Sequence, residues 1–193
     1  MIDITSVQEE KQNTRTAVLA ARREFMSGCD APKLVAPIFD KIQELMEFRM
    51  AQNVMAYASQ DDELPLYDFL ALAQKLDKTV YLPGRGKKKY GMDAVRLPEL
   101  AKMPAPPWGF WWEEGKRVPP TELDFIIVPG VAFSLQGDRL GSGCGYYDRF
   151  LKRADTAYRL GVAWECQLKD TLPTEPHDIK MHAILTESRF IET

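Results

Sequence analysis

The sequence predicts an α/β protein, with a single three-layer α/β/α domain over residues 1–193 and a mostly parallel central sheet. Segments with strand-like and helix-like patterns alternate along the chain, as they do in βαβ units. The run Phe125–Val128 is continuously apolar, which is typical of a strand covered on both faces. No internal repeat and no shift in composition marks a second domain.

Apolar residues that recur at intervals of three and four predict the helices. The first runs from about Ile4 to Ser27, with Gly28 as its stop, and the second from about Pro32 to Phe48. A third helix opens at Pro65 and ends near Leu76, and another begins near Tyr146.

Short apolar or β-branched runs predict the strands. Besides Phe125–Val128, which stops at Pro129-Gly130, these are Asn53–Ala58, Thr79–Leu82 with a stop at Pro83-Gly84, Met92–Leu97, Tyr158–Trp164 and Ala183–Thr186. Residues 103–120 are rich in proline and tryptophan, and we expect an ordered loop packed on the body because exposed tryptophans are costly.

Composition narrows the classes of function. The net charge of −3 gives no broad basic field, so no nucleic-acid partner is indicated. No apolar run is long enough to span a bilayer, and the polar stretch Asp3–Arg15 lacks the core of a signal peptide. The three cysteines are far apart and form no CxxC pair, which favours a reducing, cytoplasmic location.

The segment Arg139–Arg149 is the richest in chemical features. Glycines at positions 141, 143 and 145 let backbone amides approach a ligand, and a helix begins directly behind them. Such a loop after a buried strand is suited to a phosphate. A tight glycine turn without a ligand explains the pattern equally well, and it matches neither GxGxxG nor the P-loop.

Charged residues elsewhere have two interpretations each. Asp148 is either a magnesium ligand or a carboxylate favoured by the first turn of its helix. Lys11 and Arg15 share a helix face and either contact polyphosphate or are solvated. The basic loop at 85–89 is either a solvated turn or a site for a phosphate or a glutamate tail.

Four other features are weaker. Glu63 lies at the expected ligand edge, but its acidic turn also serves as a helix entry. The tryptophans at 108, 111 and 112 either stack on a heterocycle or pack. His177, Asp178 and His182 alone are a poor metal set, and Cys144 is either a reactive thiol or a small residue that fits.

The segments Asp124–Phe133, Gly137–Gly141 and Gly143–Arg149 together resemble the signature of the 5-formyltetrahydrofolate cyclo-ligases, also called methenyltetrahydrofolate synthetases. The resemblance extends over most of the chain. It departs from the family at Gly84, where many members have arginine, at Cys144 and His182, and in the stretch Trp108–Glu114.

The resemblance implies specific roles. ATP and Mg²⁺ are the implied cofactors, Arg139 and Tyr147 the catalytic residues, and Asp148 and Asp178 the metal ligands. The folate would contact Tyr57, Glu63, Trp108 and Tyr146. The ATP-binding set would be Lys11, Arg15, Arg139, Leu140, Gly141, Ser142, Gly143, Cys144, Gly145, Tyr146 and Tyr147.

The implied activity is the ATP-dependent cyclisation of 5-formyltetrahydrofolate to 5,10-methenyltetrahydrofolate, with release of ADP and phosphate. The protein is expected to be a monomer or a weak homodimer that binds neither nucleic acid nor membrane. One alternative is a non-catalytic nucleotide- or folate-binding protein of the same fold. Another is a relative of sugar-phosphate isomerases or acyl-CoA transferases.

Overall fold

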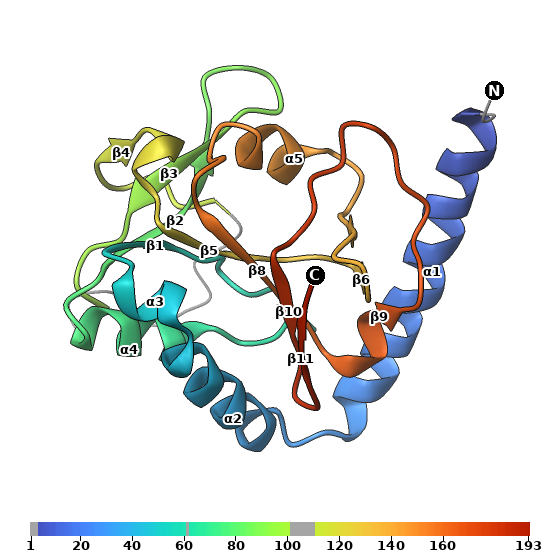
Figure 1. The fold of residues 1–193 in the computed structure, drawn as a ribbon, viewed down its shortest axis with the longest axis horizontal. Helices are drawn as coiled ribbons and strands as arrows, with labels where there is room; N and C mark the ends of the chain where they lie inside the picture. The colour runs from blue at the N-terminus through green and yellow to red at the C-terminus, as the bar shows by residue number, and fades with distance from the viewer. Residues whose placement is uncertain (1–3, 61, 101–110) are drawn as a thin grey trace.

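A central sheet of eight strands organises the protein, as the computed structural model shows for residues 4–60, 62–100 and 111–193 (Figure 1). The strand order is β11-β10-β8-β5-β1-β2-β3-β4. The five strands from β10 to β2 run parallel, and antiparallel strands flank them at both edges. The bounds are β1 Asn53–Met55, β2 Thr79–Arg85, β3 Met92–Arg96, β4 Arg117–Val118, β5 Phe125–Val128, β8 Tyr158–Val162, β10 Ala183–Leu185 and β11 Phe190–Glu192.

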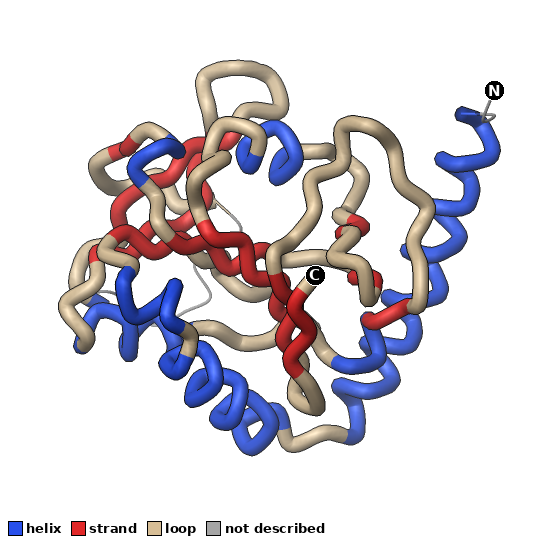
Figure 2. Tube along the Cα trace, viewed as in Figure 1, coloured by secondary structure: helices blue, strands red, loops and turns tan. Residues whose placement is uncertain are grey.

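The helices divide between the two faces of the sheet because successive strand side chains point to opposite faces. On β5, Phe125 and Ile127 join the core beneath the longer helices, whereas Ile126 and Val128 join the core beneath α5. Figure 2 shows the helices in blue around the red strands of the sheet. One face is covered by α2 (Ala31–Glu44), α3 (Met46–Met50) and α4 (Tyr67–Lys75), and the other by α5 (Tyr146–Leu151). The predicted α/β class and mostly parallel sheet are therefore confirmed.

The long helix α1 (Ile4–Gly28) lies along one side of the molecule (Figure 1). It packs on a small second sheet of β7 (Arg139–Leu140), β6 (Ala132–Ser134) and β9 (Leu168–Lys169), with Val18 in the shared core. This packing sets the polar face of α1 beside the loop that leaves β7.

The structure corrects several expected boundaries. Strand β2 continues through Pro83 and Gly84 because β3 pairs with it over this stretch, while its side toward β1 is unpaired beyond Tyr81. A proline is tolerated on such an unpaired edge. The second helix breaks at Leu45, whose extended backbone (ψ 130°) separates α2 from α3. Strands predicted to reach Ala58, Leu97, Trp164 and Thr186 end one to three residues earlier.

Short elements were not predicted from the sequence. These are β6, β7, β9, β11, β4, and the 3-10 helices η2 (Pro120–Glu122) and η3 (Glu165–Gln167). The predicted loop 103–120 therefore contains β4 and η2, while residues 103–110 lie outside the described residues. Among the described helices, none is long and apolar enough to cross a membrane.

Candidate active site

A cavity of about 410 Å³ lies between α1, the loop after β7, the start of α5 and the segment before β10. It brings together most of the residues predicted to bind ligands, although they come from distant parts of the sequence. The predicted residues that line it are Lys11, Arg15, Glu63, Arg139, Leu140, Gly141, Ser142, Gly143, Gly145, Tyr146, Tyr147, Asp148 and Asp178.

The glycine loop is shaped by two left-handed backbone positions. Gly143 has φ 104° and Gly145 has φ 63°, and residues with a Cβ rarely adopt these values. Among the described residues, the backbone N–H groups of Ser142, Gly143 and Cys144 have no hydrogen-bond partner. Helix α5 has only six residues, so the loop amides, more than a long helix dipole, make this wall attractive to an anion.

Arg139 and Asp148 form a tight ion pair in the cavity wall. Nη2 of Arg139 donates to both carboxylate oxygens of Asp148 at 2.9 Å, and the two side chains are 4% and 13% exposed. The guanidinium also lies 5.6 Å from the centre of the Tyr147 ring. Its Nε is buried without a hydrogen-bond partner in the described part of the chain. Arg139 is therefore fixed in place yet retains hydrogen-bonding capacity.

The two predicted cations of α1 are directed into the cavity and not into solvent. Nζ of Lys11 donates to Glu175 at 2.8 Å and to Asp178 at 2.6 Å, and the residue is 4% exposed. Nε of Arg15 donates to the carbonyl oxygen of Gly141 at 2.8 Å, which ties α1 to the glycine loop. Burial lowers the pKa of Arg15, while nearby negative charges oppose this effect.

Carboxylates near these cations provide oxygen ligands of the type that magnesium prefers. Asp178 and Asp148 both line the cavity, and the N–H of Ile179, next to Asp178, donates to Asp148 at 3.4 Å. Each carboxylate is neutralised by Lys11 or Arg139. One ligand atom each from Glu175, His177 and Asp178 also lie within 4.8 Å of one another. The donor set fits a hard divalent cation.

A carboxylate and a buried tyrosine also line the cavity. Glu63 lines it, and Oε2 of Glu63 accepts from the N–H of Gln60 at 3.0 Å. Tyr147 is 5% exposed, and its hydroxyl has no partner among the described residues. Burial, followed by the negative charge of Glu63, raises the pKa of Tyr147 well above its ordinary value. This hydroxyl is therefore a donor and not a base at neutral pH.

Two predicted ligand-binding residues are placed differently from this group, and a third is not described. Tyr57 is 2% exposed and its hydroxyl donates to the carbonyl of Leu64, so it lies behind the wall that carries Glu63. Cys144 is exposed and is not among the residues lining the cavity. Trp108 lies outside the described residues.

Aromatic residues flank the cavity at Tyr146. Its ring packs edge-on against Trp111 and Tyr90, with centroid distances of 5.0 and 5.9 Å. Trp112 is partly buried against the main core, so these two tryptophans serve packing. The guanidinium of Arg85 lies 6.0 Å from the ring centre of Trp111, and the residue does not line the cavity.

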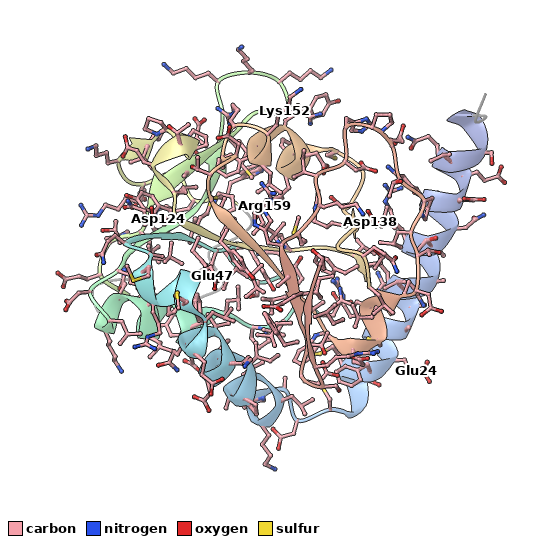
Figure 3. All side chains as sticks on the ribbon, in the orientation of Figure 1. Glu24, Glu47, Asp124, Asp138, Lys152 and Arg159 are labelled. Atoms are coloured by element: carbon pink, nitrogen blue, oxygen red, sulfur yellow. The ribbon has the colours of Figure 1, made fainter. Side chains whose placement is uncertain are left out.

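His182 lies away from the predicted site. It packs beside Tyr158 and contacts Arg159 on β8, which Figure 3 shows far from α1. The lining residues that were not predicted as site residues include two charged ones: Glu175, which holds Lys11, and Arg22 on α1. Glu175 lies three residues before Asp178, and Arg22 continues the spacing of Lys11 and Arg15 along one helix face.

The structure thus defines an α/β protein with one cavity that is lined by cations, a glycine loop, carboxylates and tyrosines. The model of the 5-formyltetrahydrofolate cyclo-ligase family matches residues 7–187. The chain belongs to this family of ligases.

Similar proteins span nearly the same length. A probable 5-formyltetrahydrofolate cyclo-ligase of Caenorhabditis elegans is 30% identical, over 80% of this chain and 82% of its own. The 5-formyltetrahydrofolate cyclo-ligase of Haemophilus influenzae is 29% identical, over 92% and 97%. The structure of Aquifex aeolicus 5,10-methenyltetrahydrofolate synthetase superposes with a TM-score of 0.80 at 32% identity, covering 94% of this chain and 92% of that one.

Proposed function

We propose that this protein is an ATP-dependent enzyme that converts 5-formyltetrahydrofolate to 5,10-methenyltetrahydrofolate, with release of ADP and phosphate. The observation that carries the proposal is the single cavity whose lining combines Lys11, Arg15, Arg139 and the glycine loop with Glu63 and Tyr147. A polyphosphate and the folate would meet in this cavity.

The reaction needs charge neutralisation and alignment more than a protein nucleophile. ATP would transfer its γ-phosphoryl group to the formyl oxygen. N10 would then attack the formyl carbon and lose its proton, and the C–O bond would break with phosphate leaving. Arg139, held by Asp148, is placed to neutralise the transferring phosphoryl group. The loop from Gly141 to Gly145 and the α1 cations would bind the remaining phosphates.

On the folate, Glu63 would accept hydrogen bonds from the pterin, and the ring of Tyr146 would pack on the pterin. The hydroxyl of Tyr147, kept protonated by its raised pKa, would donate to an oxygen of either substrate. Tyr57 would support Glu63 from behind through Leu64.

We further infer that Asp148 and Asp178 hold Mg²⁺, which neutralises phosphate charge when it is bound. In the structure, Arg139 pairs with Asp148 and Lys11 pairs with Asp178. The three free cysteines agree with the predicted reducing, cytoplasmic location. We still predict that the protein is a monomer or a weak homodimer.

The test is to incubate the purified protein with 5-formyltetrahydrofolate and Mg-ATP, and to follow the methenyl product by its absorbance together with ADP release. We expect one ADP for each product formed. ADP release without cyclisation would contradict the proposal. Binding of both ligands without product would support the non-catalytic alternative instead.

A further inference from the structure

Helix α1 contributes a third cation to the cavity. Arg22 follows Lys11 and Arg15 at intervals that keep all three on one helix face. It lines the cavity near Glu63 and is only 7% exposed, whereas its neighbour Arg23 has a side chain 73% exposed. Figure 3 shows Glu24, one residue further on, at the outer side of the molecule. One face of α1 thus presents all three cations to the cavity.

Arg22 makes one strong contact. Its Nη2 donates to Oδ1 of Asp62 at 2.6 Å, and the two side chains are 8% and 18% exposed. Nε of Arg22 and Oδ2 of Asp62 are buried without a hydrogen-bond partner in the described residues. Asp62 also faces Nε of the exposed Arg23 at 4.0 Å, so the short, buried hydrogen bond from Arg22 is the stronger of its two contacts with α1.

Asp62 directly precedes Glu63. The turn is closed internally, because the N–H of Glu63 donates to the carbonyl of Gln60 at 2.7 Å and Oε2 of Glu63 accepts from the N–H of Gln60. The contacts that attach this turn to the body include those of Arg22 and Arg23 with the carboxylate of Asp62, and that of Nε1 of Trp164 with its carbonyl at 3.3 Å. Arg22 makes the shorter of the two contacts with α1.

We propose that Arg22 is a positioning residue for recognition of the folate substrate. By binding Asp62, Arg22 fixes the position of Glu63 relative to the face of α1 that carries Lys11 and Arg15. The inference rests on the proposed function, in which Glu63 contacts the folate. Arg22 itself does not touch the reacting atoms, since its polar contact is made to Asp62.

The test compares Arg22→Met, Arg22→Lys and the surface control Arg49→Met, each assayed with one substrate varied and the other saturating. Arg49 is exposed and does not line the cavity, whereas Arg23 is unsuitable as a control because it also faces Asp62. Loss of one charge-assisted hydrogen bond corresponds to about a tenfold change in an equilibrium. We expect Arg22→Met to raise the KM for 5-formyltetrahydrofolate about tenfold, with the KM for ATP and kcat nearly unchanged. Arg22→Lys should recover part of the loss, and Arg49→Met should match the wild type.

A double variant separates positioning from folding. Arg22→Met alone leaves the largely buried Asp62 carboxylate with only the exposed Arg23 at 4.0 Å and lowers Tm, whereas Arg22→Met with Asp62→Asn removes the buried charge. We expect the double variant to regain most of the Tm but to keep the raised folate KM. Recovery of both values would overturn the inference, because Arg22 would then only stabilise the fold.

Glu63→Gln distinguishes failure of this inference from failure of the proposed function. If Glu63→Gln leaves the folate KM unchanged, the proposed folate contact is wrong. If Glu63→Gln raises the folate KM but both Arg22 variants leave it unchanged, only the role of Arg22 is overturned. If Arg22→Met raises the KM for ATP and the KM for folate equally, the positioning role of Arg22 is also contradicted.

Discussion

Replacing Arg139 by glutamine should separate the contribution of the Arg139–Asp148 ion pair to stability from the contribution of Arg139 to catalysis. In the folded protein, Arg139 and Asp148 are 4% and 13% exposed and share two hydrogen bonds at 2.9 Å. Breaking a buried pair from one side costs about 3–5 kcal/mol, and the lower figure suits Asp148 because it keeps some solvent contact. For a chain of this size, about 3 kcal/mol lowers Tm by roughly 6–12 °C.

The effect on catalysis should be larger than the effect on stability. A guanidinium that neutralises a transferring phosphoryl group is worth about 10³-fold or more in kcat. We therefore expect Arg139→Gln to lower kcat by about 10³ under conditions where circular dichroism shows the variant fully folded. Arg139→Lys should lose less kcat, because it keeps the positive charge. It should still fall below the wild type, because an ammonium cannot reproduce the guanidinium's hydrogen bonds to Asp148.

The assay measures kcat and both KM values at a temperature well below the Tm of each variant. Arg189→Gln serves as the control, since Arg189 pairs with Glu165 and does not line the cavity. An Arg139→Gln protein with a lowered Tm and unchanged kcat would show that the pair is purely structural. The reasoning about the phosphoryl group would then be refuted.

Three further predictions follow from the same geometry. Glu63→Gln should raise the folate KM about tenfold and leave ATP binding nearly unchanged by calorimetric titration, whereas equal losses for both ligands would indicate a folding defect. Cys144→Ser should retain activity because the side chain does not line the cavity, while maleimide labelling of Cys144 should be slowed by ATP; labelling that ATP does not affect would place the nucleotide elsewhere. Burial raises the pKa of Tyr158 to about 12, so its stabilising contribution is complete below pH ~10 and is lost as pH rises through ~12. Urea titrations should show a smaller loss in that window for Tyr158→Phe, and an identical loss would assign the effect to other groups.

The sequence predicted the parts of the site that depend on local pattern. The apolar run Phe125–Val128 and the glycines before Tyr146 identify a buried strand and a loop that can approach an anion, and the structure has both. The pairing of Lys11 with Asp178 could not be predicted from spacing. It depends on how α1 packs across β6 and β7, two short strands without a periodic signal.

Other differences have the same cause, since tertiary contacts override local preference. Pro83 and Gly84 are ordinary strand terminators, yet β3 supplies an antiparallel partner that carries β2 to Arg85. Tyr57 ends a strand pattern at the ligand edge, but Leu64 folds back over its hydroxyl. In the sequence, Arg22 has the same spacing as the apolar residues of α1, and only the structure shows that its side chain is buried against Asp62.

The predicted magnesium site can be tested through the coupling of its two carboxylates. If Asp148 and Asp178 hold one ion, Asp148→Asn and Asp178→Asn should each raise the magnesium concentration needed for half-maximal activity about tenfold. The double variant should need much less than the product of the two single changes, because the second substitution removes a ligand from a site already lost. The measurement is activity against magnesium concentration for all four proteins. Independent, multiplicative losses, or full activity in excess chelator, would contradict a shared site. A raised requirement in Glu175→Gln and Asp178→Asn but not in Asp148→Asn would instead place the ion at the cluster with His177.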